Sequence, residues 1–449
     1  MIDLKNLEQY RENNRIEAKT ALGGLPHSLW ETYSAFANTL GGVLLLGVRE
    51  AKNKSLYPVD LPDPEDLIRV FWMEVNNPDR ASVNLLSWDD ISVETVEGKR
   101  IVVIRIPRAG RTQRPVYVGG DPMTGTYRRS GEGDYRCNRE EVEAMQRDAA
   151  KRSQDLFPVD VPLETLNYPS VEQYDDELPI RPDYGFLSWI GAAERNKMGI
   201  LCPTAAGLLM FGKTEEIRQV FPHYSVTYSE GTGFRLRSDT PGWSGNLWDF
   251  YCRVRRRLGR NLDPAVQEAL TGALINCLVN ADYYGRRGVT VIRRRDRIVL
   301  TNAGLFRIDP ETARSGGVSD PRNSGIARMF YLVGMGERTG SGIPNLYAVW
   351  QDRGWSPPEI RERFLPEETT VTLPLKKKPV FHLGSEGGGA AEESRREAVI
   401  EYLTYHVTGG ADEMARLLGV RRQEAERILE TLRADGVIVP EGDVYRLKA

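Results

Sequence analysis

The chain has 449 residues, of which 40% are hydrophobic and 27% charged, and its formal net charge is −3. At roughly 150 residues per domain, this length predicts about three domains, and the small net charge means that nucleic-acid binding would need local basic patches. The four cysteines form no CxxC pair, the N-terminus is polar, and no apolar run reaches the roughly 20 residues of a membrane span. We therefore expect a cytoplasmic protein without a structural zinc site or a membrane segment.

Residues 1–152 are expected to form an α/β domain. The spacing of apolar residues predicts a helix over 28–40, a buried strand over 43–48 and a helix over 62–77. A strand over 99–107, a hairpin within 114–137 and a helix over 139–152 follow. The next stretch, 153–185, contains five prolines and many acidic residues without a clear period, which predicts a linker.

Residues 186–375 are expected to form a second body. Its best-defined helix covers 263–285, with Asp263 at the cap and Pro264 at the first position. A hairpin over 288–304 follows, with its turn at Arg295-Asp296. Other helices are predicted within 203–213, 245–262, 324–336 and 342–354, and strands within 223–233 and 369–375.

The C-terminal part begins with a glycine-rich stretch, 376–393, whose composition predicts a flexible linker. Helices over 394–407, 410–419 and 421–436 and a two-stranded wing over 437–448 then give the order of a winged helix. In such a unit the third helix enters the major groove of DNA.

The N-terminal end of that third helix carries Arg421, Arg422 and Gln423, which are placed to reach base edges. The same helix also carries Glu424 and Glu426. The alternative is therefore a winged helix that serves protein contact or dimerisation.

Two carboxylates and an ammonium lie close together in the segment 10–24. Glu12 and Glu17 are five residues apart, and Lys19 follows two residues later. Clustered carboxylates can hold Mg²⁺ or Mn²⁺ for phosphoryl chemistry, and a lysine can stabilise the developing charge or bind a phosphate. The alternative is a half-exposed strand with its charged side chains in solvent.

A second group of polar residues lies within 265–345. Asn276, Asn280 and Asp282 belong to the predicted helix, and Gly340 and Gly342 precede another helix. Glycine-rich turns before helices expose backbone N–H groups to anions, and an asparagine can complete a Mg²⁺ shell. Each feature alone is more often a surface or cap residue.

Basic runs flank the same helix. The run that follows the helix contains Arg286, Arg287, Arg293, Arg294 and Arg295, which are candidates for contact with a nucleic-acid backbone. The alternative for each run is an ordinary solvated face.

In their order along the chain, "LTGALINCLVNADYYG", "DRIVLTNAGLF", "DPRNSGIARMF" and "GERTGSGI" resemble the divergent GHKL-type ATPase domain of RecG-related bacterial transcriptional regulators. The resemblance implies an ATP site in which Asn276 holds Mg²⁺. The implied nucleotide-binding residues are Asn276, Asn280, Asp282, Asn302, Gly304, Gly340 and Gly342. The family's general-base glutamate falls on Gly272, which argues against ATP hydrolysis because glycine offers no base. A domain that has lost the nucleotide and only supports a dimer is the alternative.

The segments "ENNRIEAK", "SAFANTLGG" and "VLLLGVRE" resemble the Alba-like domain of Schlafen proteins. In Schlafen nucleases the matching carboxylates, here Glu12, Glu17 and Glu50, bind metal and cleave RNA. This chain has Arg49-Glu50 where the family has two aspartates, and many bacterial members are described only as nucleic-acid binders. Under that second role Lys19 would contact phosphate.

Together these features predict an α/β (α+β) multidomain protein with an Alba/Schlafen-like domain, a GHKL-like α/β sandwich and a C-terminal winged helix. We expect a nucleic-acid-binding transcriptional regulator, DNA being the expected target, with a degenerate ATP-binding domain that senses nucleotide or mediates homo-oligomer formation. The first alternative is a metal-dependent RNase of the Schlafen type, acting in phage defence and using Glu12, Glu17, Glu50 and Lys19 with Mn²⁺ or Mg²⁺. The second is an oligomeric scaffold without a ligand.

Overall fold

The protein is an α+β multidomain chain, described by a computed structural model. The structure describes residues 4, 7, 12–182, 184–231, 233–336, 340–364, 366–376, 395–396, 398–400, 402–403, 409–418, 420–441 and 444–447. Most of the expected linker 376–393 and of the expected helix 394–407 lies outside the described residues. The chain divides into two compact units, one of residues 1–109, 113–142 and 379–449 and one of residues 110–112 and 143–378. The division falls inside helix α4 (Arg139–Ala149) rather than at 152.

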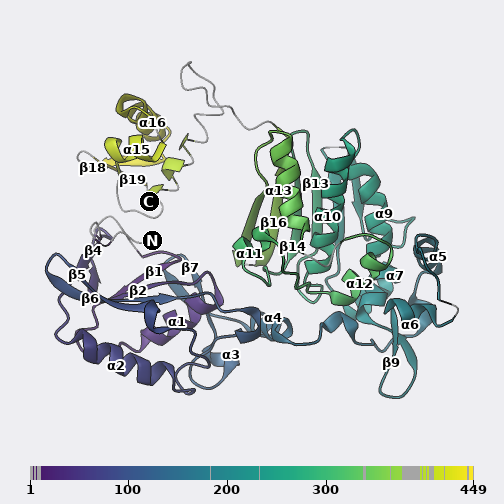
Figure 1. Cartoon of the computed structure of the whole chain (residues 1–449), viewed down its shortest axis with the longest axis horizontal. Helices are drawn as coiled ribbons and strands as arrows, with labels where there is room; N and C mark the ends of the chain where they lie inside the picture. Colours follow the sequence, from purple (N-terminus) through teal and green to yellow (C-terminus); the bar gives the residue numbers. More distant parts are fainter. Residues whose placement is uncertain are drawn as a thin grey trace. The chain divides into compact units, whose positions relative to one another are not determined.

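The first unit is built around a four-stranded sheet of order β1-β2-β6-β5 (Figure 1). β1 runs parallel to β2, and the other neighbours are antiparallel. The remaining strands form two separate two-stranded sheets, β3 with β4 and β7 with β8. Its strands are β1 (Ile16–Lys19), β2 (Gly42–Leu46), β3 (Val48–Glu50), β4 (Leu56–Pro58), β5 (Ile91–Val96), β6 (Lys99–Ile106), β7 (Tyr127–Ser130) and β8 (Gly133–Arg136). Its helices are α1 (Ser28–Asn38), α2 (Pro64–Val75), α3 (Pro122–Gly125) and the first part of α4.

Helix α1 confirms the helix predicted over 28–40, and it buries Trp30, Tyr33 and Phe36. The chain leaves α1 through Gly41, whose φ of +70° is favourable only for glycine. A Cβ there would lie 2.8 Å from the carbonyl oxygen of Ile106. The glycine therefore allows the helix end to approach the last residues of β6.

The hairpin expected within 114–137 is shorter than predicted, because its paired strands are β7 and β8, and Tyr117 and Thr126 form only an isolated bridge. Asn38 explains why the chain before β7 stays close to α1. Its side-chain amide donates to the carbonyls of Val116 at 2.7 Å and Tyr127 at 2.9 Å, and its oxygen accepts from the Val116 N–H.

The second unit contains a six-stranded sheet of order β12-β11-β13-β14-β16-β15. Only β11 and β13 are parallel. Figure 1 shows α9, α10 and α13 side by side along this sheet, and α10 contacts both neighbouring helices and β14. Its strands are β9 (Ala193–Arg195), β10 (Leu201–Pro203), β11 (Val226–Glu230), β12 (Phe234–Arg237), β13 (Val289–Arg293), β14 (Arg297–Ala303), β15 (Glu359–Phe364) and β16 (Glu367–Pro374). Its helices are α5 (Tyr168–Asp176), α6 (Phe186–Ile190), α7 (Ala205–Phe211), α8 (Thr214–Val220), α9 (Leu247–Leu258), α10 (Pro264–Asn280), α11 (Pro310–Ser315), α12 (Ser324–Leu332) and α13 (Gly342–Asp352), with the rest of α4.

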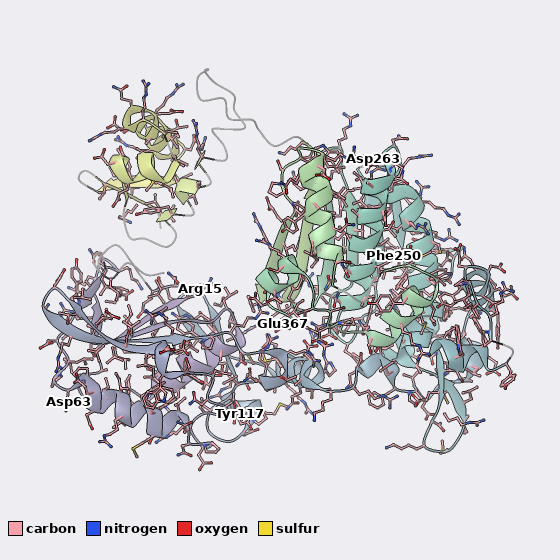
Figure 2. The ribbon with its side chains drawn as sticks, in the orientation of Figure 1. Arg15, Asp63, Tyr117, Phe250, Asp263 and Glu367 are labelled. Carbon is pink, nitrogen blue, oxygen red and sulfur yellow. The ribbon has the colours of Figure 1, made fainter. Side chains whose placement is uncertain are left out.

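Helix α10 begins as predicted, with Asp263 at its N-cap and Pro264 in the first turn. The Asp263 carboxylate accepts from the N–H groups of Ala265 at 3.0 Å and Val266 at 3.3 Å. Figure 2 shows Asp263 at this end of α10 and Phe250 on α9, where it is fully buried. These local interactions fix the helix that carries several of the candidate site residues.

The prediction of a linker over 153–185 is wrong, because this stretch is folded into the second unit. Tyr174 of α5 is fully buried, and its hydroxyl donates to the carbonyl of Met329 at 2.7 Å. Asp155 is 2% exposed and accepts from the N–H of Ile326 at 2.9 Å. The prolines suggested a linker because proline usually interrupts helices. Pro169, however, lies in the first turn of α5, where a missing N–H costs little.

The C-terminal segment has a core of its own. α15 (Ala411–Leu418) and α16 (Arg422–Ala434) accompany a three-stranded sheet of order β17-β19-β18. The strands are β17 (Gly409–Gly410), β18 (Ile438–Glu441) and β19 (Val444–Leu447). The helices expected over 410–419 and 421–436 and the pairing of the last two strands are confirmed. In the part of the chain that the structure describes, no helix is long and apolar enough to cross a membrane.

Candidate functional site

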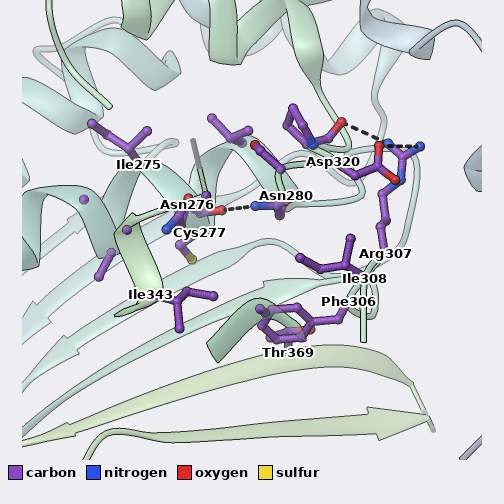
Figure 3. A pocket seen from close by; sticks show the side chains of 18 of the residues that line it. Ile275, Asn276, Cys277, Asn280, Phe306, Arg307, Ile308, Asp320, Ile343 and Thr369 are labelled. Carbon is purple, nitrogen blue, oxygen red and sulfur yellow. Dashed lines mark hydrogen bonds and ion pairs between the residues drawn. The ribbon is translucent and has the colours of Figure 1, made fainter. Parts of the chain in front are cut away.

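A cavity of about 160 Å³ lies in the second unit between α10 and the neighbouring strands and loops. Figure 3 shows Asn276 and Asn280 on one side, and Ile343, Phe306 and Thr369 on the other. Its walls are mainly apolar, with a few polar groups among them, which is the usual character of a small-molecule site.

Five of the seven residues predicted to bind nucleotide line this cavity: Asn276, Asn280, Asn302, Gly340 and Gly342. They come from α10, from β14 and from the segment that enters α13. The structure thus brings together residues that are up to 66 positions apart in the sequence.

The asparagines differ in how strongly the protein already engages them. Asn276 is exposed on α10, and its backbone carbonyl accepts from the Asn280 amide at 3.0 Å. Asn302 is 6% exposed, and its amide donates to the carbonyl of Ala303 at 3.0 Å. A Cβ at position 342 would lie 3.2 Å from Asn276 Nδ2, so glycine at 342 leaves that side chain uncrowded.

The other two predicted residues, Asp282 and Gly304, do not line the cavity. Asp282 is nearly buried and accepts from Arg147 at 3.3 Å and from the N–H of Tyr284 at 3.1 Å. Gly304 has a φ of +91°, and a Cβ there would lie 2.7 Å from the guanidinium of Arg322. Both residues therefore shape the turn behind the cavity and do not face its interior.

The cavity also contains polar residues that the sequence patterns did not single out: Thr369, Arg307 and Asp320. Thr369 donates from its hydroxyl to the carbonyl of Gly304 at 2.8 Å, which ties β16 to the end of β14. Arg307 follows the "TNAG" segment, and Asp320 precedes "PRNSG". Asp320 is the first residue of the quoted segment "DPRNSGIARMF", and Arg307 directly follows "DRIVLTNAGLF", so their place in or beside these segments was the available signal.

Arg307 and Asp320 belong to a network of charges at one end of the cavity. The Arg307 side chain is 6% exposed and lies 3.6 Å from Asp320, which also pairs with Arg111. Arg322 pairs with Asp148 at 2.5 Å. Burial lowers the pKa of the Arg307 guanidinium below its ordinary value, although the Asp320 charge opposes this effect. The Arg307 Nε is buried without a hydrogen-bond partner among the described residues.

Gly272 stands where the resembled family has its general base. A Cβ added at 272 would meet no described atom within 4 Å, so the position faces open space. Glu268, one helical turn earlier, lines an adjoining groove and not the cavity. Asp320 is the only carboxylate among the cavity-lining residues that the structure describes, and two arginines engage it.

In the first unit, Glu17 is held by cations. Its side chain is 7% exposed and accepts from Arg129 at 2.6 Å, and it also pairs with Lys19. Arg129 is itself buried and reaches Asp134 at 2.9 Å. This arrangement gives Glu17 a structural role.

Glu12 and Glu50 lie near Glu17. Burial, followed by repulsion from Glu17 and then from Glu50, raises the pKa of Glu12 to about 7. Glu12 accepts from the N–H of Ala18 at 3.0 Å, and Glu50 pairs with Lys54 at 3.5 Å. The three carboxylates thus interact, but among the described residues no group of three His, Cys, Asp or Glu side chains is arranged to hold a metal ion.

The predicted basic contact residues differ in their exposure. Arg293 donates to the carbonyls of Arg257 and Arg260, both at 2.6 Å, and so fixes the end of α9. Arg294 and Arg295 are exposed at the hairpin turn, as are Arg286 and Arg287 on the preceding segment. Arg293 is thus partly engaged, because each of its terminal nitrogens donates to a backbone carbonyl, and its contact with a nucleic-acid backbone stays a prediction.

At the N-terminus of α16, Arg421, Arg422 and Gln423 are all exposed. Arg422 pairs with Glu426 at 2.9 Å and with Asp412 at 3.1 Å. Arg421 and Gln423 therefore remain the better-placed contact residues of this helix.

Comparison with protein families gives three matches. Residues 12–138 match the family described as "Schlafen, AlbA_2", residues 143–227 a domain of unknown function (DUF8451), and residues 287–373 "Putative ATP-dependent DNA helicase recG C-terminal". The third match begins after α10, so Asn276 lies outside it. The second match includes the stretch that was expected to be a linker.

Two solved structures are similar to the chain. The DIP2311 protein from Corynebacterium diphtheriae is 19% identical, over 97% of this chain and 80% of that one, with a TM-score of 0.41. The N-terminal domain of a RecG-related protein from Nitrosomonas europaea is 34% identical, over 30% of this chain and 94% of that one, with a TM-score of 0.24. No curated protein matches. On the family matches, the chain carries a Schlafen AlbA_2 domain at residues 12–138 and a RecG C-terminal-type domain at residues 287–373.

Proposed function

We propose that this protein is a nucleic-acid-binding transcriptional regulator whose second unit binds ATP in the cavity beside α10. The observation that carries the proposal is that five residues predicted to bind nucleotide line one largely apolar cavity. An apolar cavity with few polar groups suits a base that is held by stacking and by a small number of hydrogen bonds. The names of the two matched families support a function related to nucleic acids.

The residues beside Asn276 fit a magnesium ion that accompanies the phosphates. Mg²⁺ takes oxygen ligands and usually keeps several waters, so one side-chain oxygen suffices beside phosphate oxygens. Asn276 is exposed and has a glycine as its neighbour at 342, which leaves room for such a shell. When bound, the ion would neutralise charge on the phosphates. Because Gly272 supplies no base, we propose binding and sensing without efficient hydrolysis.

Calorimetry with ATP and Mg²⁺ tests the nucleotide part on the full-length chain. We expect binding in the wild type and a loss of at least about tenfold, or 1.4 kcal/mol, in Asn302→Ala and Asn276→Ala. Gln351→Ala on α13 is the control, because Gln351 is exposed and lines neither the cavity nor the groove beside Glu268. Absence of binding heat at millimolar ATP would refute this part.

Fluorescence anisotropy with labelled duplex DNA tests the nucleic-acid part. We expect Arg421→Gln and Gln423→Ala to weaken binding, and affinity to fall with increasing salt. Coupling between the two ligands should appear as a roughly 5- to 150-fold change in DNA affinity when ATP is present. Identical DNA affinity with and without ATP would leave the nucleotide without a regulatory role. Light scattering of the eluting protein tests the expected homo-oligomer.

A metal-dependent RNase is the second candidate. It is favoured by one observation: burial and the neighbouring carboxylates raise the pKa of Glu12 to about 7, where a general acid or base is most effective. Incubation with tRNA and Mn²⁺ tests it. Cleavage that Glu12→Gln abolishes would support the nuclease, and intact RNA in all samples would exclude it.

A further inference from the structure

The cavity is small for a whole nucleotide. Its volume of about 160 Å³ lies below the roughly 300–1,000 Å³ that is usual for small-molecule sites. If the proposed function holds, the cavity would enclose the base, and the phosphates would extend past Asn276, which lies against Gly342 at the edge of the cavity, into the space beyond. Any site for those phosphates therefore rests on the proposed function.

A wide groove of about 1,120 Å³ adjoins the cavity. Four residues line both spaces: Gly272, Ile275, Gly336 and Gly342. Three of the four are glycines, so few side-chain atoms stand at the junction. Gly272 matters most, because a glutamate at this position would place a negative charge where the two spaces meet.

The groove is lined by arginines from the basic end of α9. Arg253 and Arg257 on this helix are engaged by Asp249 at 2.7 Å and by Glu230 at 3.7 Å. Arg255 and Arg256 are exposed, line the groove, and form no ion pair with any residue that the structure describes. Helix α9 therefore presents one set of neutralised arginines and one set that is available to an anion.

Arg255 also lies close to the junction with the cavity. Its guanidinium is 4.0 Å from the sulfur of Met335, the residue before Gly336. Arg260, just beyond α9, lines the same groove. Helix α13 begins at Gly342, which also lines the groove, so the positive end of the helix dipole lies beside it.

We propose that this groove binds the phosphate chain of a nucleoside polyphosphate whose base occupies the cavity, and that Arg255, Arg256 and Arg260 hold its terminal phosphates. The three arginines lie within six consecutive residues, a span of roughly 8 Å at a helical rise of about 1.5 Å per residue. Glu177 and Glu268 also line the groove, so its arginines exceed its carboxylates by one. So small an excess suits a short phosphate chain, whereas polynucleotide sites commonly neutralise about 6–10 phosphates.

The test is a calorimetric series of adenosine, AMP, ADP and ATP on the full-length chain. In the wild type we expect affinity to rise with each phosphate, by about tenfold or more in total. In the Arg255→Gln/Arg256→Gln double variant the series should become nearly flat, while adenosine binds as in the wild type. Arg253→Gln is the matched control, since Arg253 lies on the same helix but is paired with Asp249, and it should keep the wild-type series.

Arg260→Gln provides a second arm at the third arginine of the groove. It should weaken ATP more than adenosine, because Arg260 lines the groove and not the cavity. Thermal unfolding of each variant checks that it is folded.

The results separate the two proposals. Adenosine binding with no gain from added phosphates would overturn the groove and leave the proposed function intact. No binding of any of the four ligands would overturn both. A single-stranded oligonucleotide that binds more tightly than ATP and depends on the same arginines would assign the groove to a polymer and overturn this inference.

Discussion

Replacing Arg129 with methionine should strongly destabilise the first unit. The Arg129 side chain is 1% exposed, and it bridges Glu17 at 2.6 Å and Asp134 at 2.9 Å. It also donates to the backbone carbonyls of Asn13 at 3.0 Å and Ile16 at 3.3 Å. Methionine keeps much of the length but leaves two nearly buried carboxylates without their shared cation. Breaking a buried ion pair in this way costs about 3–5 kcal/mol.

Hydrogen exchange followed by mass spectrometry measures this cost within the full-length chain. For amides of β1 and β2, a loss of about 3–5 kcal/mol corresponds to exchange that is roughly 10²- to 10⁴-fold faster. Adding Glu17→Gln and Asp134→Asn to Arg129→Met should recover much of the protection, because the uncompensated charges are then gone. Arg69→Met is the control: Arg69 is largely exposed, and its surface pair with Asp66 should be worth less than about 1 kcal/mol. Exchange in Arg129→Met within tenfold of the wild type would refute the reasoning.

Three further outcomes are expected. The pKa of Glu12 is about 7 in the folded protein and ordinarily 4.5, so the contribution of Glu12 to stability should fall as pH rises from about 4.5 to 7. Glu12→Gln should therefore raise the melting temperature at pH 8 but not at pH 4, both measured in EDTA. An equal effect at the two pH values would contradict this reasoning. Gly340→Ala should lower the stability of the fold more than Gly354→Ala. Both glycines have a positive φ, which costs alanine about 1–2 kcal/mol, but only at 340 would the Cβ also clash with the Val318 carbonyl. Equal melting temperatures of the two variants would argue against the clash. Tyr174→Phe should lose about 1–2 kcal/mol with the buried bond to Met329, and an unchanged melting temperature would mean that α5 is not tied to the second unit.

Local patterns in the sequence predicted the local structure well. The apolar spacing of α1, the Asp263-Pro264 start of α10 and the turn at Arg295-Asp296 all depend on residues near one another in the chain. Some strands were not predicted, among them β5, although its "ISVETV" alternates, and β15. β15, for example, reads "EIRERF", and its charged residues obscure the alternation.

The features that the sequence did not predict depend on contacts between residues that are far apart in the chain. The motifs predicted five of the cavity residues, but whether Asp282 and Gly304 face the cavity depends on Arg147 and Arg322, which are distant in sequence. The role of Arg293 likewise depends on two carbonyls more than 30 residues away. The carboxylates of the first unit looked free to bind metal because Arg129, 112 residues from Glu17, gives no sign of this pairing in the sequence.

The glycine at 272 also bears on how the protein would respond in time. In a site that hydrolyses its nucleotide, the rate of hydrolysis limits the lifetime of the bound state. With no base at position 272 to accelerate hydrolysis, bound ATP would leave mainly by dissociation, and the occupied fraction of the protein would follow the surrounding ATP concentration. Such a protein would respond reversibly to the ATP concentration, and no exchange factor would be needed to remove a hydrolysis product.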